Sequence, residues 1–308
     1  MRQQQTVGRV MTCSGVGLHT GKPAMIKLCP APADTGIVFI RNQNGSRIAL
    51  SASVGNLIPA ELCTTIGANG AAVKTVEHVL AALSGLSVDN AFIELDGEEV
   101  PVMDGSADPF VRLIRAAGII PQDCPQAFLK IMQPIEVVDG QKRIIVEPSP
   151  TTRITYSIQY DHPLIQQQTY VYDWSASLFD RTIAAARTFG FMKEVKYLWS
   201  RGLGKGGSLE NTIILSEQGV LNESGLRFHD EFVRHKILDL IGDLAFLGVP
   251  MIGHVIADRA GHALHTKLVE AILAQPDKWV LMNTKEQGVS AQTLSPRAAY
   301  APQPASYC

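Results

Sequence analysis

The segment from residue 228 to residue 244 carries side chains that could bind a metal ion. His235, Asp239 and Asp243 follow one another at intervals of four residues, and residues at this spacing lie on one face of an α-helix. An imidazole and a carboxylate that point the same way are suited to be two ligands of one metal ion. The opposite face carries the apolar stripe of a packed helix, formed by Val233, Ile237, Leu240, Ile241 and Leu244.

The alternative for this pattern is a solvated helix face with a His–Asp pair. Two features argue against it. Phenylalanines, instead of lysines and glutamates, continue the polar face, and Gly242 lies within the helical pattern. A glycine inside a helix is less favourable than alanine by roughly 1 kcal/mol, so it typically marks a close approach by another part of the chain. The phenylalanines are Phe228, Phe232 and Phe246.

Glu77 and His78 form a second candidate pair, in the first turn of a predicted helix that Thr75 is placed to cap. Together with His235 and Asp239, His78 would complete a set of two histidines and one aspartate with a fourth position open for water. That set is typical of catalytic zinc sites. Zinc lowers the pKa of bound water to about 7, and Glu77 could take its proton during attack on a carbonyl. Spacing alone does not bring the two pairs together.

Other residues that attract attention have simpler interpretations. Cys63 is expected to be a small buried residue, because no neighbour that would activate its thiol is identifiable. The glycine-rich segments 15–21 and 202–207 match neither the dinucleotide-binding nor the P-loop spacing, so the first is interpreted as a turn. Four histidines lack an acidic or histidine neighbour at ligand spacing and are expected in packing or at the surface: His19, His229, His254 and His265.

Composition excludes several classes of protein. The 308 residues are 46% hydrophobic and 18% charged, which allows two domains with real cores. A formal net charge of −2 without a basic run does not indicate a nucleic-acid surface. No apolar signal region or long apolar window is present, so neither export nor membrane spanning is predicted, and the cytoplasm is the expected location.

The pattern of elements predicts an α+β fold of two domains, 1–124 and 125–308, separated by a linker at 121–125. In the first domain, helices are expected after Thr75 and over 109–117. In both domains strands come first and helices later, and in the second the strands alternate as in an antiparallel sheet. The tail beyond Val289 is expected to be poorly ordered. The expected strands are 6–12, 24–29, 37–40, 90–95, 128–131, 135–138, 143–147, 153–160 and 252–257, with a last helix from 261 to Leu273.

Five segments of the sequence occur together, in the same order as in a known family: residues 75–78, 103–107, 186–191, 232–239 and 261–264. Together they resemble the UDP-3-O-acyl-N-acetylglucosamine deacetylases, the zinc amidases of lipid A biosynthesis. The likeness extends from residue 15 to about Leu273. It implies two domains of similar topology, each a β-sheet layer packed on a helix layer, with the active site at the domain interface.

The resemblance also implies roles for individual residues. One zinc ion would be held by His78, His235 and Asp239, with Glu77 as the general base. His262 would steady the oxyanion and protonate the leaving amine. Thr188 would polarise the amide carbonyl, and Asp243 would orient the catalytic histidine.

On the substrate side, the resemblance associates Phe189, Phe191 and Lys236 with the sugar nucleotide, and we add Cys63 to the candidate substrate-binding residues. Glu194 stands where an aspartate is expected and keeps the negative charge at that position. An insert at about 190–216 resembles a hydrophobic passage for the 3-O-acyl chain, with Ile213 in its wall. Ordinary core is the alternative for the apolar run 191–199. The segment 160–163 would lie near the nucleotide.

The implied reaction removes acetate from UDP-3-O-(3-hydroxyacyl)-N-acetylglucosamine, in a Gram-negative-type cell. The chain is expected to act as a monomer on this small molecule, without a nucleic-acid partner or a membrane span. Two other functions stay open. A different zinc amidase or peptidase would share the metal chemistry, although the sequence has no HExxH motif. A binding protein would use the zinc only for structure.

Overall fold

The structure is a computed structural model that describes residues 2–43 and 45–282. The tail beyond Val289, expected to be poorly ordered, lies outside the described residues.

Two five-stranded sheets of the same topology form the outer layers, which confirms the predicted likeness of the two halves. In each sheet, two antiparallel hairpins flank a central strand that comes later in the chain, antiparallel to one neighbour and parallel to the other. The second sheet is mixed, because its strands 153–159 and 254–258 run parallel. Of the strands expected to form an antiparallel sheet, 135–138 and 143–147 do pair antiparallel, whereas 128–131 belongs to a different sheet. The first sheet has the order β2 (Met11–Val16), β3 (Pro23–Pro30), β9 (Ala91–Leu95), β4 (Ile37–Gln43) and β5 (Ser46–Ser51). The second has the order β12 (Ile135–Asp139), β13 (Lys142–Glu147), β19 (His254–Asp258), β14 (Arg153–Gln159) and β15 (Gln167–Asp173).

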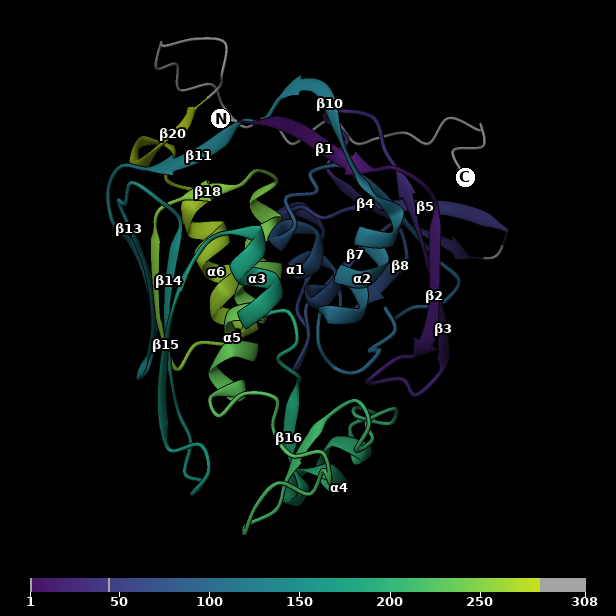
Figure 1. The fold of residues 1–308 in the computed structure, drawn as a ribbon, viewed down its shortest axis with the longest axis vertical. Coiled ribbons are helices and arrows are strands. Elements are labelled where there is room, and N and C mark those ends of the chain that lie inside the picture. The colour runs from purple at the N-terminus through teal and green to yellow at the C-terminus, as the bar shows by residue number, and fades with distance from the viewer. Residues whose placement is uncertain (1, 44, 283–308) are drawn as a thin grey trace.

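All α-helices except the one at Met192–Ser200 lie between the two sheets, with strands of the first sheet on the right and of the second on the left in Figure 1. One continuous cluster of buried side chains includes residues from both halves of the chain. The fold is α+β, as predicted. Its α-helices here are α1 (Glu77–Gly85), α2 (Asp108–Ala117), α3 (Ala176–Thr182), α5 (Glu231–Leu244) and α6 (His262–Leu273).

Smaller sheets complete the fold. The segment 121–125, expected to be a linker, belongs to strand β10 (Ile119–Pro125), which pairs with β1 (Gln3–Val7). Prolines are tolerated there because this two-stranded sheet has only edge strands. The domain boundary at 124/125 stays a prediction. The other strands are β6 (Leu57–Ile58), β7 (Thr65–Ala68), β8 (Ala71–Lys74), β11 (Phe128–Ile131), β18 (Met251–Ile252) and β20 (Trp279–Met282). The insert consists of β16 (Phe189–Phe191), α4 (Met192–Ser200) and β17 (Ile213–Leu215), and short 3₁₀ helices span Val54–Asn56, Ala245–Leu247 and Pro276–Lys278.

Helices α1 and α5 are in direct contact, and a glycine permits their approach. A methyl group on Gly242 would lie 2.1 Å from the carbonyl oxygen of Glu77. The close approach expected at Gly242 is therefore confirmed, and it places the first turn of α1 on the polar face of α5.

Helix α1 begins at Glu77, as expected, but Thr75 does not cap it. The residue before the helix is Val76, which makes no side-chain capping bond. Thr75 instead adopts φ +57° and donates its hydroxyl to Glu99 Oε1 at 2.9 Å. Its side chain is thereby turned away from the helix end.

Candidate active site

The contact between α1 and α5 brings together the three expected metal ligands. Nε2 of His235 lies 3.3 Å from Oδ1 of Asp239, and Nε2 of His78 lies 3.6 Å from the same oxygen. All three side chains are buried, so the solvated-face alternative is wrong. Ligand atoms about 2.0–2.1 Å from a tetrahedral zinc ion are separated by roughly 3.3 Å, so the two pairs of atoms are close to that spacing.

The bonding of these residues fits a bound cation. Oδ1 of Asp239 is buried and, among the described residues, has no hydrogen-bond partner, although two imidazole nitrogens face it. Its other oxygen accepts from Lys236 Nζ at 2.9 Å. Burial opposes ionisation of Asp239, but the positive charges of Lys236 and His262 help to outweigh it, and the pKa of Asp239 lies well below the usual value. The carboxylate is therefore an anion with one oxygen left to bind a metal.

His235 is prepared as a neutral ligand. Burial lowers its pKa to about 3, so the ring is uncharged at neutral pH. Its Nδ1 donates to the carbonyl oxygen of Ala186 at 3.1 Å, which leaves the lone pair on Nε2 directed at Asp239. A second hydrogen bond of this kind sets the tautomer and the ring orientation of metal-binding histidines.

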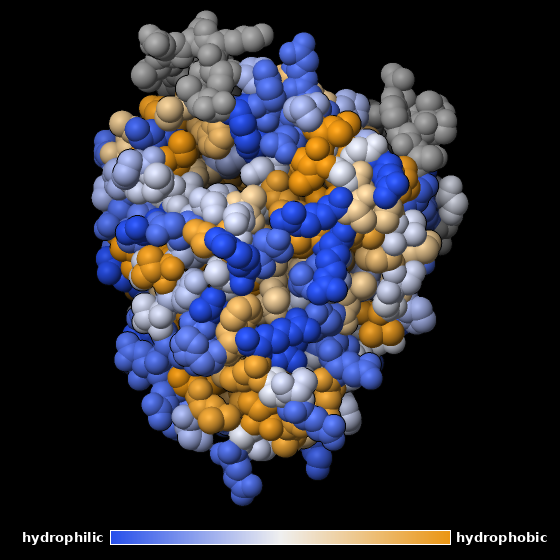
Figure 2. Space-filling view, in the orientation of Figure 1, coloured by the Kyte–Doolittle hydropathy of each residue, from blue (hydrophilic) through white to orange (hydrophobic). Residues whose placement is uncertain are grey.

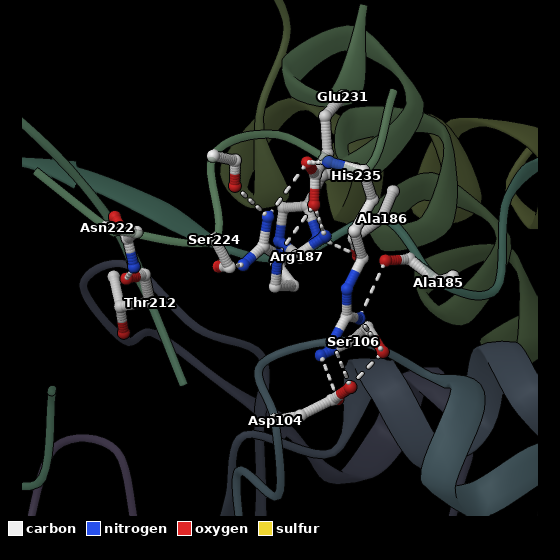
Figure 3. Close-up of polar contacts among 12 residues, drawn as sticks. Asp104, Ser106, Ala185, Ala186, Arg187, Thr212, Asn222, Ser224, Glu231 and His235 are labelled. Atoms are coloured by element: carbon white, nitrogen blue, oxygen red, sulfur yellow. Dashed lines mark hydrogen bonds and ion pairs between the residues drawn. The ribbon is translucent and has the colours of Figure 1, made fainter. Parts of the chain in front are cut away.

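A buried ion pair holds the segment that supplies this carbonyl group (Figure 3). Arg187 donates from Nε and from its backbone N–H to Oε1 of Glu231, at 2.8 and 3.0 Å. Glu231 is the first residue of α5, so the pair attaches Ala186 to the helix that carries His235. Thr188, the next residue, donates its N–H to Gly105 at 2.8 Å. Its backbone is thereby fixed, and the role of its hydroxyl stays a prediction.

Glu77 and His262 lie at the edge of the ligand set. Nε2 of His262 is 3.7 Å from Asp239 Oδ2 and 4.0 Å from Glu77 Oε1. Burial favours the neutral imidazole, but Asp243 and Asp239 outweigh it and raise the pKa of His262 to about 9. Burial also raises the pKa of Glu77, and the nearby His262 and His78 only partly oppose this. Glu77 can therefore accept a proton, and it lies beside His262, which stays protonated at neutral pH.

The carboxylate of Asp243 accepts three hydrogen bonds, one of them from His262. Its Oδ2 accepts from Nδ1 of His262 and from Nδ1 of His265, both at 2.8 Å, and its Oδ1 accepts from the Thr64 hydroxyl at 2.5 Å. Thr64 also donates its N–H to Glu77 Oε2 at 3.0 Å. Asp243, His262 and His265 also lie close enough together to be a second metal-binding group, but both carboxylate oxygens of Asp243 already accept hydrogen bonds.

Sequence reasoning missed Thr64 and the part played by His265. His265 is completely buried, and its Nε2 lies 2.9 Å from the hydroxyl of Tyr156. The packing interpretation of His265 is thus correct but incomplete. Its spacing of three from His262 on one helix was a usable signal. Thr64 offered no comparable signal.

Of the residues expected to bind substrate, Phe189, Phe191 and Lys236 lie close together. The ring of Phe189 lies 5.7 Å from that of Tyr160 and 6.5 Å from that of Phe191, and Lys236 Nζ is 5.8 Å from its centre. Glu194 is exposed in the first turn of α4. Binding of a nucleotide by this aromatic cluster stays a prediction.

Cys63 is buried, as expected, and burial together with the nearby Glu77 raises the pKa of its thiol to about 11. The thiol is therefore protonated at neutral pH, which does not favour a nucleophilic role. A contact with substrate stays a prediction.

The insert presents an apolar surface. No residue of α4 is buried, and Met192, Tyr197 and Trp199 are 48%, 59% and 57% exposed. The ordinary-core alternative is therefore wrong for this helix. Ile213 on β17 is fully buried. Apolar surface gathers at the lower end of the molecule in Figure 2, where Figure 1 places the insert.

Within the described residues, no helix is both long enough and apolar enough to cross a membrane.

Comparison with known proteins identifies close relatives. The family model described as UDP-3-O-acyl N-acetylglycosamine deacetylase matches residues 4–274. A UDP-3-O-acyl-N-acetylglucosamine deacetylase of Syntrophus aciditrophicus is 45% identical over 90% of this chain and 88% of its own length. Proteins of the same name from Citrifermentans bemidjiense and Wolinella succinogenes are 46% and 43% identical. These matches cover 94% and 92% of this chain, and 94% and 95% of the two relatives. The chain therefore belongs to the UDP-3-O-acyl-N-acetylglucosamine deacetylase family.

Proposed function

We propose that this protein is a zinc-dependent deacetylase that hydrolyses the N-acetyl amide of UDP-3-O-(3-hydroxyacyl)-N-acetylglucosamine in lipid A biosynthesis. The products are the free amine and acetate. The observation that carries the proposal concerns Oδ1 of Asp239, which has no hydrogen-bond partner in the described part of the chain. It faces His78 and His235 beside Glu77 and His262. The relatives' names supply the substrate.

His78, His235 and Asp239 would hold the zinc ion. When bound, zinc polarises an amide carbonyl and makes a water molecule acidic enough to lose a proton near neutral pH. Two neutral imidazoles and one carboxylate leave the ion a net positive charge and a fourth position, as in catalytic sites. A purely structural site would have no need of the acid and base residues beside it.

The chain's own residues supply the proton transfers. Glu77 accepts the proton of the attacking water, and its raised pKa makes the carboxylate a stronger base than an exposed glutamate. His262 is protonated at neutral pH because its pKa is about 9. It steadies the negative charge that develops on the carbonyl oxygen and then donates its Nε2 proton to the leaving amine, while Asp243 holds Nδ1. The Thr188 hydroxyl would donate to the same carbonyl.

The remaining assignments rest on the family. The sugar nucleotide would lie against Phe189, Phe191 and Lys236, with Glu194 and Cys63 as further contacts. We expect the protein to work as a monomer in the cytoplasm.

The direct test is acetate release from UDP-3-O-acyl-N-acetylglucosamine by the purified protein. We expect a chelator to abolish the release and one equivalent of zinc to restore it, because the three ligands bind a single ion. A protein reloaded with zinc that releases no acetate contradicts the proposal. Amide-bond cleavage in peptides by the same preparation would favour the peptidase alternative.

A second prediction concerns the acyl passage. If Ile213 lines it, each buried methylene of the substrate contributes about 0.8 kcal/mol, so affinity rises roughly fourfold per methylene until the passage ends. Ile213→Trp should then shorten the preferred chain and leave the zinc content unchanged. Val138→Trp, at an exposed apolar position outside the insert, is the matched control. Equal losses for all chain lengths with a lower Tm would show that Ile213 is ordinary core.

A further inference from the structure

Thr75 has a backbone conformation that its side chain disfavours. Its φ is +57°, in the left-handed region, and the residue is buried. A β-branched residue is a genuine outlier there. Such outliers persist only where their surroundings impose them, and they gather at functional sites. Thr75 stands two residues before Glu77 and three before His78.

Several hydrogen bonds impose this conformation. On one side, Lys74 donates its N–H to the carbonyl of Glu98 at 2.9 Å and accepts from the N–H of Val100 at 3.1 Å. On the other side, Val76 donates its N–H to the carbonyl of Thr64 at 3.2 Å. These are backbone bonds to the residues before and after Thr75. The side chain of Thr75 itself is held by its hydroxyl bond to Glu99.

Glu99 is buried, and both of its carboxylate oxygens are filled by donors. Oε1 accepts the Thr75 hydroxyl at 2.9 Å and the N–H of His19 at 2.8 Å. Oε2 accepts the N–H of Thr20 at 2.8 Å and its hydroxyl at 2.6 Å. A methyl group on Gly17 would lie 2.3 Å from Oε2. One carboxylate thus joins Thr75 to the turn at residues 17–21.

The same turn receives the insert. Gly206 donates its N–H to the carbonyl of Leu18 at 3.0 Å, and a methyl group on Gly206 would lie 2.2 Å from the carbonyl oxygen of Gly17. The two glycine-rich segments 15–21 and 202–207, which match no nucleotide-binding spacing, therefore pack on each other. Glu99 accepts hydrogen bonds from the backbone of His19 and Thr20 in this turn and from the hydroxyl of Thr75.

We propose that Glu99 is a positioning residue for Glu77 and His78. It holds Thr75 in its left-handed conformation, which sets the direction in which the chain enters α1, and it ties that entry to the turn on which the insert docks. The inference rests on the proposed function, because that proposal assigns His78 to zinc and Glu77 to proton transfer.

Glu99→Gln is a sharp test because an amide has the wrong hydrogen-bond pattern in either orientation. Its NH₂ group would face the backbone N–H of His19 at one position or that of Thr20 at the other. We expect zinc affinity, measured by chelator competition without turnover, and kcat each to fall about 10- to 100-fold, the usual effect of losing support behind a metal ligand. Glu98→Gln is the matched control, since Glu98 is partly exposed and pairs with Lys22.

Rescue separates positioning from general stability. Thr75→Gly adopts positive φ without an anchor, so adding it to Glu99→Gln should return zinc affinity toward that of the parent. Glycine also relieves the strain of a positive φ at this position, so zinc affinity is measured well below the Tm of each variant. A merely destabilised variant is then fully folded and binds zinc like the parent. If Glu99→Gln fails to fold, Thr75→Val removes only the hydroxyl and should weaken zinc binding in the same direction.

The outcomes are distinct. Parent-like zinc affinity in folded Glu99→Gln, or in Thr75→Val, overturns the inference about Glu99, as does a double variant that Thr75→Gly does not rescue. A parent protein that binds no zinc, or a His78→Ala variant that binds it as tightly as the parent, overturns the proposed function instead.

Discussion

Replacing His78 or Asp239 with alanine is expected to abolish both zinc binding and deacetylation. A methyl group offers no lone pair, and the two remaining ligands are too few for a stable site. Since a metal ion supplies several kcal/mol of transition-state stabilisation, and each 1.36 kcal/mol is a factor of ten, activity should fall by at least about 10³-fold. The two changes should have the same effect because each removes one of three ligands.

Zinc content by atomic absorption and acetate release from the same preparations check this expectation. His229→Ala is the matched control, because the side chain of His229 is 90% exposed and lies outside the ligand set. Unchanged zinc stoichiometry in both ligand variants would refute the metal assignment, whatever happens to activity.

The sequence predicts those parts of the site in which all the residues lie on one helix. Periodicity places His235 and Asp239 on one face of α5, and the structure shows them 3.3 Å apart. Gly242 signals a close approach, and the partner is the backbone of Glu77. Periodicity does not predict which segment approaches Gly242, because the contact between α1 and α5 depends on how the two halves of the chain pack.

The supporting groups could not be predicted, because they come from loops and from distant segments. Thr64 lies between short strands and reaches Asp243 across 179 positions of the chain. Thr75 looks like a helix cap by type, but tertiary contacts turn its hydroxyl to Glu99. Residues 121–125 look like a linker, yet they pair with the N-terminal strand β1. In each instance a long-range hydrogen bond overrides a local preference.

The second large effect is expected from Glu77→Gln. The amide keeps the shape of the side chain and can still accept the N–H of Thr64, but it cannot take a proton from water. Zinc content should therefore remain that of the parent, while kcat falls roughly 10²- to 10⁴-fold, the range of general acid–base catalysis. Loss of zinc together with activity would show that Glu77 acts as a ligand instead of a base.

The pH profile separates the base from the acid. His262 must be protonated to act, and its pKa is raised to about 9, so kcat/KM should be maintained below that pH and fall as the pH rises through it. Glu77 must be ionised, and its pKa is also raised, so kcat/KM should fall on the acid side as the pH drops through that value. The resulting bell reports the coupled site, so its limbs are assigned by variants. His262→Ala should lower kcat/KM and remove the fall near pH 9, because no proton is then left to lose. A His262→Ala enzyme that keeps the parent's basic limb would exclude His262 as the acid.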